Sequence, residues 1–329
     1  MQVERDYHVF KRTSVLLPDP PTPEPAAPGS RTLGRGRTRV VGELVWRETG
    51  HVRVVRFPAY RQYEATRTEA SNAMMALLAG AQLAGHLLQL TEGSDRLLPE
   101  VFPRVAHIGR FNLTSEAARE ILADADSHLG AMSVPYALSI HEDFLKTCLA
   151  LLAQARRCTS DTAVKARLFN AHAWIEKATG GTFTVDSVLQ LHTLRAMRNC
   201  QIHDGGRAST VLLDTISAWT AGAEAGWVRQ AKRSPRRLKL GNQVDLGQAE
   251  LILTLAVTKT LAREANELLQ PALSRQMWAD ILIDDLFSAD LHAQRAPDRL
   301  RRARGLARFH YTPLRLTDQE ITASFNRQP

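Results

Sequence analysis

Apolar residues recur at helical spacing through most of the chain between about residues 136 and 270. In the first such stretch two adjacent apolar lines give a helix with a broad buried face: Phe144, Cys148, Leu151 and Ala155, then Leu145, Leu149 and Leu152. Two glycine pairs, Gly180-Gly181 and Gly205-Gly206, close the next two periodic stretches, as is common at helix C-termini. Helices of roughly 15 to 22 residues joined by short loops predict an antiparallel bundle. The fold class is therefore mostly α.

The first 132 residues carry different signals. Residues 1–37 contain a proline-rich run at 18–30 and then a basic, glycine-broken run, which together predict an extended arm. In residues 38–132, two β-rich runs flank Gly50, Val40 to Trp46 and Val52 to Phe57, and predict a hairpin. Helices are expected from about Glu69 to Leu90 and from Thr114 to about Leu129. This part is predicted to be an accessory segment.

The remaining helices follow from caps and breakers. We expect one long helix from about Tyr136, one from Ser160-Asp161 through Ala178 with Val164 in its core, and a third that Thr182 or Thr184 caps. Further helices are predicted around Leu212–Trp219 and over 248–269, separated by a basic loop at 229–240 with a short strand toward Val244. Residues 271–329 predict a basic helical extension, with helices over Met277 to Phe287 and after Thr317.

The charge and the cysteine content of the chain indicate what it binds and in which compartment it works. The 329 residues carry a net charge of +8, and arginine, which suits bidentate recognition of phosphate, supplies most of the excess. A GC-rich genome would also favour arginine. Three cysteines, Cys148, Cys158 and Cys200, show no pairing or metal-binding spacing, which is typical of a reducing compartment. A charged N-terminus and the absence of a long apolar run predict a cytoplasmic protein without membrane contact.

One short motif carries candidate chemistry: Arg198-Asn199-Cys200-Gln201-Ile202-His203, followed by Asp204-Gly205-Gly206. Five residues of a continuous helix turn about 500°, so Arg198 and His203 would lie about 140° apart. For both to reach one site, the helix is expected to break between them, and the glycines favour such a break. A guanidinium and an imidazole at a helix end suit reaction at a phosphodiester.

This motif resembles the R-N-x-x-x-H signature of the HEPN superfamily (higher eukaryotes and prokaryotes nucleotide-binding). The small residues after His203 fit the resemblance, as does the position at the end of the third helix of a bundle. The resemblance covers about residues 136 to 270, and we assign 133–270 to a HEPN-like domain.

The resemblance implies a homodimeric, metal-independent endoribonuclease whose composite site joins the motifs of two subunits. His203 would act as the acid/base, Arg198 would clamp the phosphate and its transition-state charge, and Asn199 would orient them. The expected product carries a 2′,3′-cyclic phosphate. No metal or other cofactor is implied. In bacteria the family is frequent in toxin–antitoxin and antiphage systems, so an antitoxin or another defence protein is an expected partner besides RNA.

Weaker candidates and alternatives remain. A Ser-x-x-x-acid pattern, Ser139 to Asp143, occurs in some HEPN proteins, and Asp204 and Arg195 are further candidate substrate-binding residues. His141 and His192 are interpreted as partly exposed, and His172 as packing. The basic runs at 232–240 and 299–308 could steer RNA, with Trp227, Phe309 and Tyr311 as the available aromatics. The first alternative is an inactive HEPN module that binds nucleotide or RNA or scaffolds a dimer; the second, a metal-binding HD-type phosphohydrolase, is suggested only by His203-Asp204.

Overall fold

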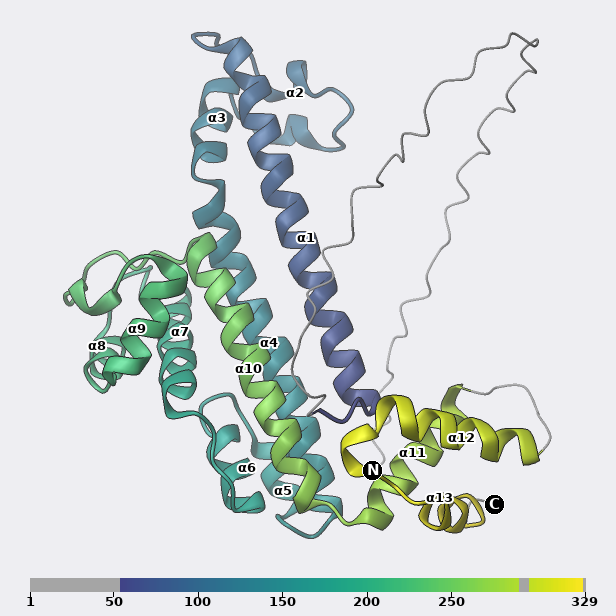
Figure 1. The fold of residues 1–329 in the computed structure, drawn as a ribbon. Helices are drawn as coiled ribbons and strands as arrows, with labels where there is room; N and C mark the ends of the chain where they lie inside the picture. The colour runs from purple at the N-terminus through teal and green to yellow at the C-terminus, as the bar shows by residue number, and fades with distance from the viewer. Residues whose placement is uncertain (1–53, 290–295, 328–329) are drawn as a thin grey trace, which may run out of the picture. The chain divides into compact units, whose positions relative to one another are not determined.

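The computed structural model describes residues 54–289 and 296–327, and this part of the chain is helical with no β-strand (Figure 1). The mostly α prediction is confirmed. The proline-rich arm and most of the predicted hairpin lie outside the described residues. Of the second hairpin strand, Val54 to Phe57 are described, and they do not form a strand.

Two long helices form the centre of the bundle, α4 (Ala125–Gln154) and α10 (Gln248–Ala272). They run parallel, because Ser127 near the start of α4 bonds Asp245 just before α10, and Arg157 just after α4 donates to the Ala272 carbonyl at the end of α10. The prediction of an antiparallel bundle is therefore wrong for this pair. Helix α1 (Pro58–Leu88) packs along α4, and α7 (Val185–His203) packs on α10 and α4 (Figure 1). Where α4 passes the segment before α10, a Cβ on Gly130 would collide with the Leu246 backbone. The predicted core lines of α4 are confirmed in part, because Leu145, Leu149 and Leu152 are fully buried.

Helix α1 begins well before the predicted start at Glu69. Pro58 occupies its first turn, where a missing N–H costs nothing. The preceding segment is held by Asn266 of α10, whose side-chain Oδ1 accepts from the Val55 amide at 2.8 Å and whose Nδ2 donates to the Val55 carbonyl at 2.7 Å. One side chain on a helix thus provides the backbone partner that a neighbouring strand would otherwise supply.

The predicted start of the next long helix at Tyr136 is also wrong. Helix α3 (Ser115–Ala123) starts at its Thr114 cap as predicted, but α4 follows almost at once and runs through Pro135. A proline inside a helix removes one backbone hydrogen bond and is normally unfavourable. Here Val134, Ala137 and Leu138 are buried on the flanking turns, so packing against neighbouring helices holds α4 together.

The single helix predicted from Ser160 to Ala178 is two helices, α5 (Ser160–Lys165) and α6 (Ala171–Thr179). Between them, Asn170 accepts a hydrogen bond from the Arg167 amide, and Glu142 of α4 accepts one from the Leu168 amide at 3.1 Å. Val164, expected in the core, is 73% exposed. The predicted stop is right: Gly180 takes the left-handed conformation directly after α6.

Beyond α7, the chain forms α8 (Thr210–Ser217) and α9 (Ala221–Ala231), the second of which was not predicted. The predicted strand toward Val244 is only an isolated bridge between Arg207 and Gln243. The C-terminal helices α11 (Arg275–Ala289), α12 (Ala296–His310) and α13 (Asp318–Phe325) pack on each other, and α13 begins at the predicted Thr317 cap. Asp285 of α11 pairs with Arg61 of α1 at 2.7 Å. Short helical turns complete the chain: α2 (Leu98–Val101), η1 (Gln89–Thr91), η2 (Ile108–Arg110), η3 (Pro235–Arg237) and η4 (Thr312–Leu314).

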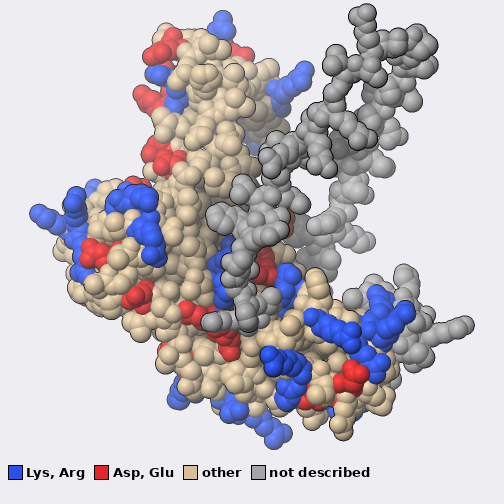
Figure 2. All heavy atoms as spheres, viewed as in Figure 1, with Lys and Arg blue, Asp and Glu red and all other residues tan. Residues whose placement is uncertain are grey.

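Helix α1 presents much of its apolar surface to the outside. Leu77, Leu83 and Leu87 are exposed, and the surface visible over α1 in Figure 2 is mostly uncharged. By length and composition the segment Pro58–Thr91 would be able to cross a membrane, and little of it is buried. The expectation that no stretch reaches membrane length is therefore too strong for this helix. The same length and composition also occur in helices of soluble proteins.

Candidate active site on helix α7

Helix α7 carries the whole motif without interruption. It runs from Val185 to His203, and its N-terminus is tied to α10 because the backbone amide and the hydroxyl of Thr184 both donate to Glu264, at 3.0 and 2.6 Å. After His203 the amides of Asp204 and Gly206 both donate to the Cys200 carbonyl oxygen, at 3.0 and 2.9 Å. Gly205 and Gly206 have φ values of 58° and 77°, which favour glycine.

The predicted break between Arg198 and His203 is therefore wrong; the chain turns only after the motif. Met197 and Cys200 are buried and hold this part of α7 in a regular helix. On an unbroken helix the two side chains lie about 140° apart. Arg198 is half-buried, whereas His203 is exposed. Within one chain, the side chains of Arg198 and His203 therefore do not meet at one site.

The structure instead aligns other polar residues along the outer side of α7. His192, Arg195 and Asn199 follow one another at helical spacing and are half-buried, with Arg198 at their edge. The Nε atoms of Arg195 and Arg198 and the Nδ1 atom of His192 are buried and have no hydrogen-bond partner within residues 54–289 and 296–327. Across the same ranges, no Asp or Glu forms an ion pair with either arginine. We refer to His192, Arg195, Arg198 and Asn199 as the α7 cationic row.

The electrostatics of the α7 cationic row favour an anion. Burial, and then the charge of Arg198, lower the pKa of Arg195. A guanidinium nevertheless stays protonated at neutral pH. Burial, and then the charge of Arg195, lower the pKa of His192, which favours its neutral form. A buried donor without a partner costs about 1–3 kcal/mol, so a phosphate oxygen at these atoms would recover energy that the free protein lacks.

Behind the α7 cationic row lies a buried histidine pair, His141 of α4 and His172 of α6. Their Nε2 atoms are 3.1 Å apart and the rings are stacked. Burial lowers the pKa of His141 to about 3, and burial together with His141 and His192 lowers the pKa of His172. For two neutral rings to share this hydrogen bond, one must carry its proton on Nε2 and the other on Nδ1.

The interpretation of His141 as partly exposed is wrong, because its neighbours on α1 and α6 cover it completely. His172 packs as expected, with its ring edge against Phe183.

The weaker candidates lie elsewhere or stand alone. Ser139 and Asp143 are exposed on α4, and Asp143 borders a groove between α1 and α4 that Tyr63 and Thr147 also line. No hydrogen bond or ion pair joins either residue to the motif in the described chain. Asp204 is exposed at the end of α7. The roles predicted for these residues, and for Arg198, Asn199 and His203, remain predictions.

In the basic loop after α9, two of the arginines are paired with acids, and RNA steering by this loop remains a prediction. Arg233 forms ion pairs with Asp245 and Glu250, at 2.6 and 2.7 Å, and Arg236 pairs with Glu224 at 2.7 Å. Three aromatic residues were considered as partners for RNA bases. Trp227 and Tyr311 are buried, and only Phe309 is exposed.

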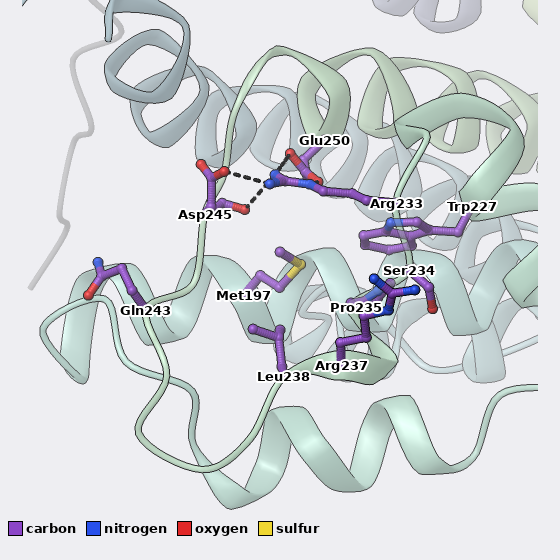
Figure 3. Close-up of a pocket in the computed structure, with 10 residues that line it drawn as sticks. All are labelled: Met197, Trp227, Arg233, Ser234, Pro235, Arg237, Leu238, Gln243, Asp245 and Glu250. Atoms are coloured by element: carbon purple, nitrogen blue, oxygen red, sulfur yellow. Dashed lines mark hydrogen bonds and ion pairs between the residues drawn. The ribbon is translucent and has the colours of Figure 1, made fainter.

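A cavity that the sequence analysis missed lies between α7, α9 and this loop (Figure 3). It has a volume of about 180 Å³, and Met197 of α7, Trp227 of α9 and Gln243 are among the residues that line it. The sequence pattern does not predict this cavity, because the residues that line it come from segments that are not adjacent in the chain.

No three His, Cys, Asp or Glu side chains converge on a possible metal position in the described part of the chain. Comparison of the sequence and the structure with protein-family models, curated proteins and solved structures found no match.

Proposed function

We propose that this protein is a metal-independent endoribonuclease that acts as a homodimer, with residues 133–270 forming a HEPN-like bundle. The observation that carries the proposal is the α7 cationic row. Arg195 and Arg198 are half-buried, their Nε donors lack partners and no acid neutralises them in the described structure. These arginines belong to or adjoin the motif that resembles the HEPN signature.

The chemistry follows from the residue types. The RNA 2′-hydroxyl attacks the adjacent phosphorus, the bond to the 5′-oxygen breaks, and the products are a 2′,3′-cyclic phosphate and a 5′-hydroxyl. Negative charge grows on the phosphoryl oxygens in the transition state, where Arg198 and Arg195 would stabilise it. One imidazole removes the 2′-hydroxyl proton and another protonates the leaving oxygen. In this proposal His203 supplies both, one from each subunit, and Asn199 orients the phosphate.

The unbroken α7 helix is the reason for proposing a second subunit. Within one chain, Arg198 and His203 point to different sides of the helix. Ile202, between them on the surface, is 53% exposed, an apolar residue next to a polar motif that a second α7 helix would cover. Two motifs facing each other would bring the arginine of one subunit to the histidine of the other.

The test is cleavage of a structured RNA pool in EDTA by the wild-type protein, Arg198→Ala and His203→Ala, with Arg229→Ala as a control on the exposed end of α9. We expect activity that survives EDTA, is lost in both motif variants, persists in the control and leaves cyclic phosphate ends. Sedimentation of the wild type is expected to give a dimer. Equal cleavage by all four proteins would refute the assignment.

A second candidate function is an RNA-binding or scaffolding module without cleavage. The specific observation in its favour is the separation of Arg198 and His203 on one regular helix. The two functions differ in cells: a toxin or antiphage nuclease would arrest growth on expression, and His203→Ala would relieve the arrest. RNA binding that Arg198→Ala weakens, together with no cleavage by the purified dimer, would favour the module.

A further inference from the structure

We propose that the cavity between α7, α9 and the loop after α9 binds a nucleobase of the RNA that the protein cleaves. This inference rests on the proposed function and adds a site for sequence recognition to it. We call the cavity the Trp227 cavity and define it by Met197, Trp227, Pro235, Arg237, Leu238 and Gln243, with Arg233, Ser234, Asp245 and Glu250 at its edge.

The first observation is a donor without an acceptor. Trp227 is 1% exposed, it lines the cavity, and its Nε1–H has no hydrogen-bond partner in the described residues. A buried indole N–H normally finds a partner, and leaving it without one is unfavourable. Figure 3 shows the indole across the cavity from Met197 and Leu238. An acceptor atom on a ligand in the cavity would satisfy this donor.

The second observation is the character of the walls. Met197, Pro235 and Leu238 present apolar surface, and Met is an adaptable partner for flat rings. The cavity, at about 180 Å³, is smaller than the usual sites for drug-sized ligands. A single planar ring system with apolar faces and a polar edge fits these walls. Nucleobases have this form, and each carries acceptor atoms on its edge.

Polar groups at the rim complete the match to a nucleotide. Arg237 is exposed, and no acid pairs with it in the described chain, so its guanidinium is available for the phosphate attached to the base. Gln243 has both a donor and an acceptor for a base edge. Its amide packs closely on Gly206, where a Cβ would collide with it. Gln243 is therefore positioned by the turn that ends the motif.

The wall formed by the loop is held in place before any ligand arrives. Arg233 binds both carboxylate oxygens of Glu250, at 3.0 and 2.7 Å, and Glu250 is 1% exposed and also accepts from the Gly247 amide. Figure 3 shows Arg233 between Asp245 and Glu250 along one side of the cavity. A site that is already ordered loses less entropy on binding. Arg233 thus holds the loop in place, while Arg237 remains available to bind a ligand.

The Trp227 cavity and the α7 cationic row use different sides of α7. Met197 lines the cavity, and on a regular helix it points about 100° from Arg198 and about 160° from Arg195 and Asn199. A base in the cavity and a phosphate on the row would therefore belong to nucleotides that are not adjacent. The cavity would select RNA by its sequence away from the cleaved bond.

The direct test is calorimetric titration of the full-length protein with AMP, GMP, CMP and UMP, and with ribose 5-phosphate as the ligand that lacks a base. We expect at least one nucleotide to bind and ribose 5-phosphate to bind at least tenfold more weakly. Trp227→Phe keeps an aromatic ring but removes the N–H together with the second ring of the indole, and we expect it to weaken nucleotide binding about tenfold. Arg237→Ala should weaken the nucleotide but leave the matching nucleoside unchanged. Lys239→Ala, on the same loop but outside the cavity lining, should change neither.

The proposal is overturned if no nucleotide binds, or if Trp227→Phe, shown by its melting temperature to be folded, binds like the wild type. The second readout is cleavage. Trp227→Phe should change which RNA sequences are cleaved, whereas Arg198→Ala should stop cleavage. Nucleotide binding without any cleavage would remove the ribonuclease proposal alone, and cleavage without nucleotide binding would remove the cavity proposal alone.

Discussion

The arginines of α7 and the arginines of the loop after α9 lie in the same bundle but have opposite environments. Arg233 and Arg236 are neutralised by carboxylates of Asp245, Glu250 and Glu224. Arg195 and Arg198 have no acidic partner in the described residues, and their Nε atoms are buried without a hydrogen bond. In the sequence the loop is the more basic of the two segments, yet Arg233 and Arg236 are paired there, and of its arginines only the exposed Arg237 has no acidic partner in the described residues.

The difference teaches that the number of arginines is a poor guide to a phosphate site. An arginine that is paired with a carboxylate stabilises the fold, and a ligand phosphate can bind that arginine only if the ion pair breaks. An unpaired, half-buried guanidinium is poorly solvated and gains from an anion. The net charge of +8 is therefore a property of the whole chain and does not locate a phosphate site. The α7 cationic row is a candidate site at a defined place in the fold.

The largest effect is expected for cleavage. Arg198→Gln, which keeps much of the side-chain length, should lower the cleavage rate about 10²–10³-fold, the usual loss for one transition-state donor. Arg236→Ala, from the paired loop, should change the rate less than about threefold. Initial rates on one RNA substrate in EDTA measure both. If the loop variant were the more defective enzyme, the comparison would be reversed.

Stability should show the opposite order. Arg233→Ala leaves Glu250 buried with only the Gly247 amide as a partner, and we expect the free energy of unfolding to fall by about 2 kcal/mol, discounted because Arg233 is half-exposed. Arg237→Ala, on the same loop without an ion pair, should stay within about 0.5 kcal/mol. Urea denaturation at neutral pH measures both. Adding Glu250→Gln to Arg233→Ala should restore part of the loss.

Acidification tests the histidines behind α7. The pKa of His141 is about 3 in the folded protein and near 6.5 when unfolded, so between these values only the unfolded state binds the proton. Stability is therefore lost as pH falls below about 6.5, by about 1.4 kcal/mol per pH unit for this one group. The lowered pKa of His172 acts in the same direction. His141→Leu should reduce the slope of unfolding free energy against pH by about one proton, and parallel wild-type and variant curves would contradict this.

The smallest effect concerns salt. Each phosphate contact releases counterions, so Arg195→Ala should reduce the slope of log affinity against log salt by about 0.7 for single-stranded RNA, while Arg236→Ala should leave it unchanged. Fluorescence anisotropy of a labelled RNA over a salt series gives these slopes. An equal reduction in both variants would mean that the paired loop also contacts the backbone.

The sequence by itself determined what depends on neighbours a few residues apart. Helical periodicity, the caps at Thr114 and Thr317 and the stop at Gly180 rest on contacts within a turn or two, and the mostly α class followed from them. Local signals misled where packing prevailed, since Pro135 lies inside α4 and the stretch from Ser160 to Ala178 is split by contacts with α4.

Only the tertiary structure decided which arginines are paired and where a cavity lies. Arg233 meets Glu250 because the chain turns back after α9, and the Trp227 cavity needs α7, α9 and the loop together. The sequence identified Arg198 and His203 by their spacing, but it could not tell that α7 continues unbroken between them, because buried Met197 and Cys200 stabilise the helix there. Pairing, burial and cavities depend on residues distant in the chain, whose meeting is a property of the packed fold.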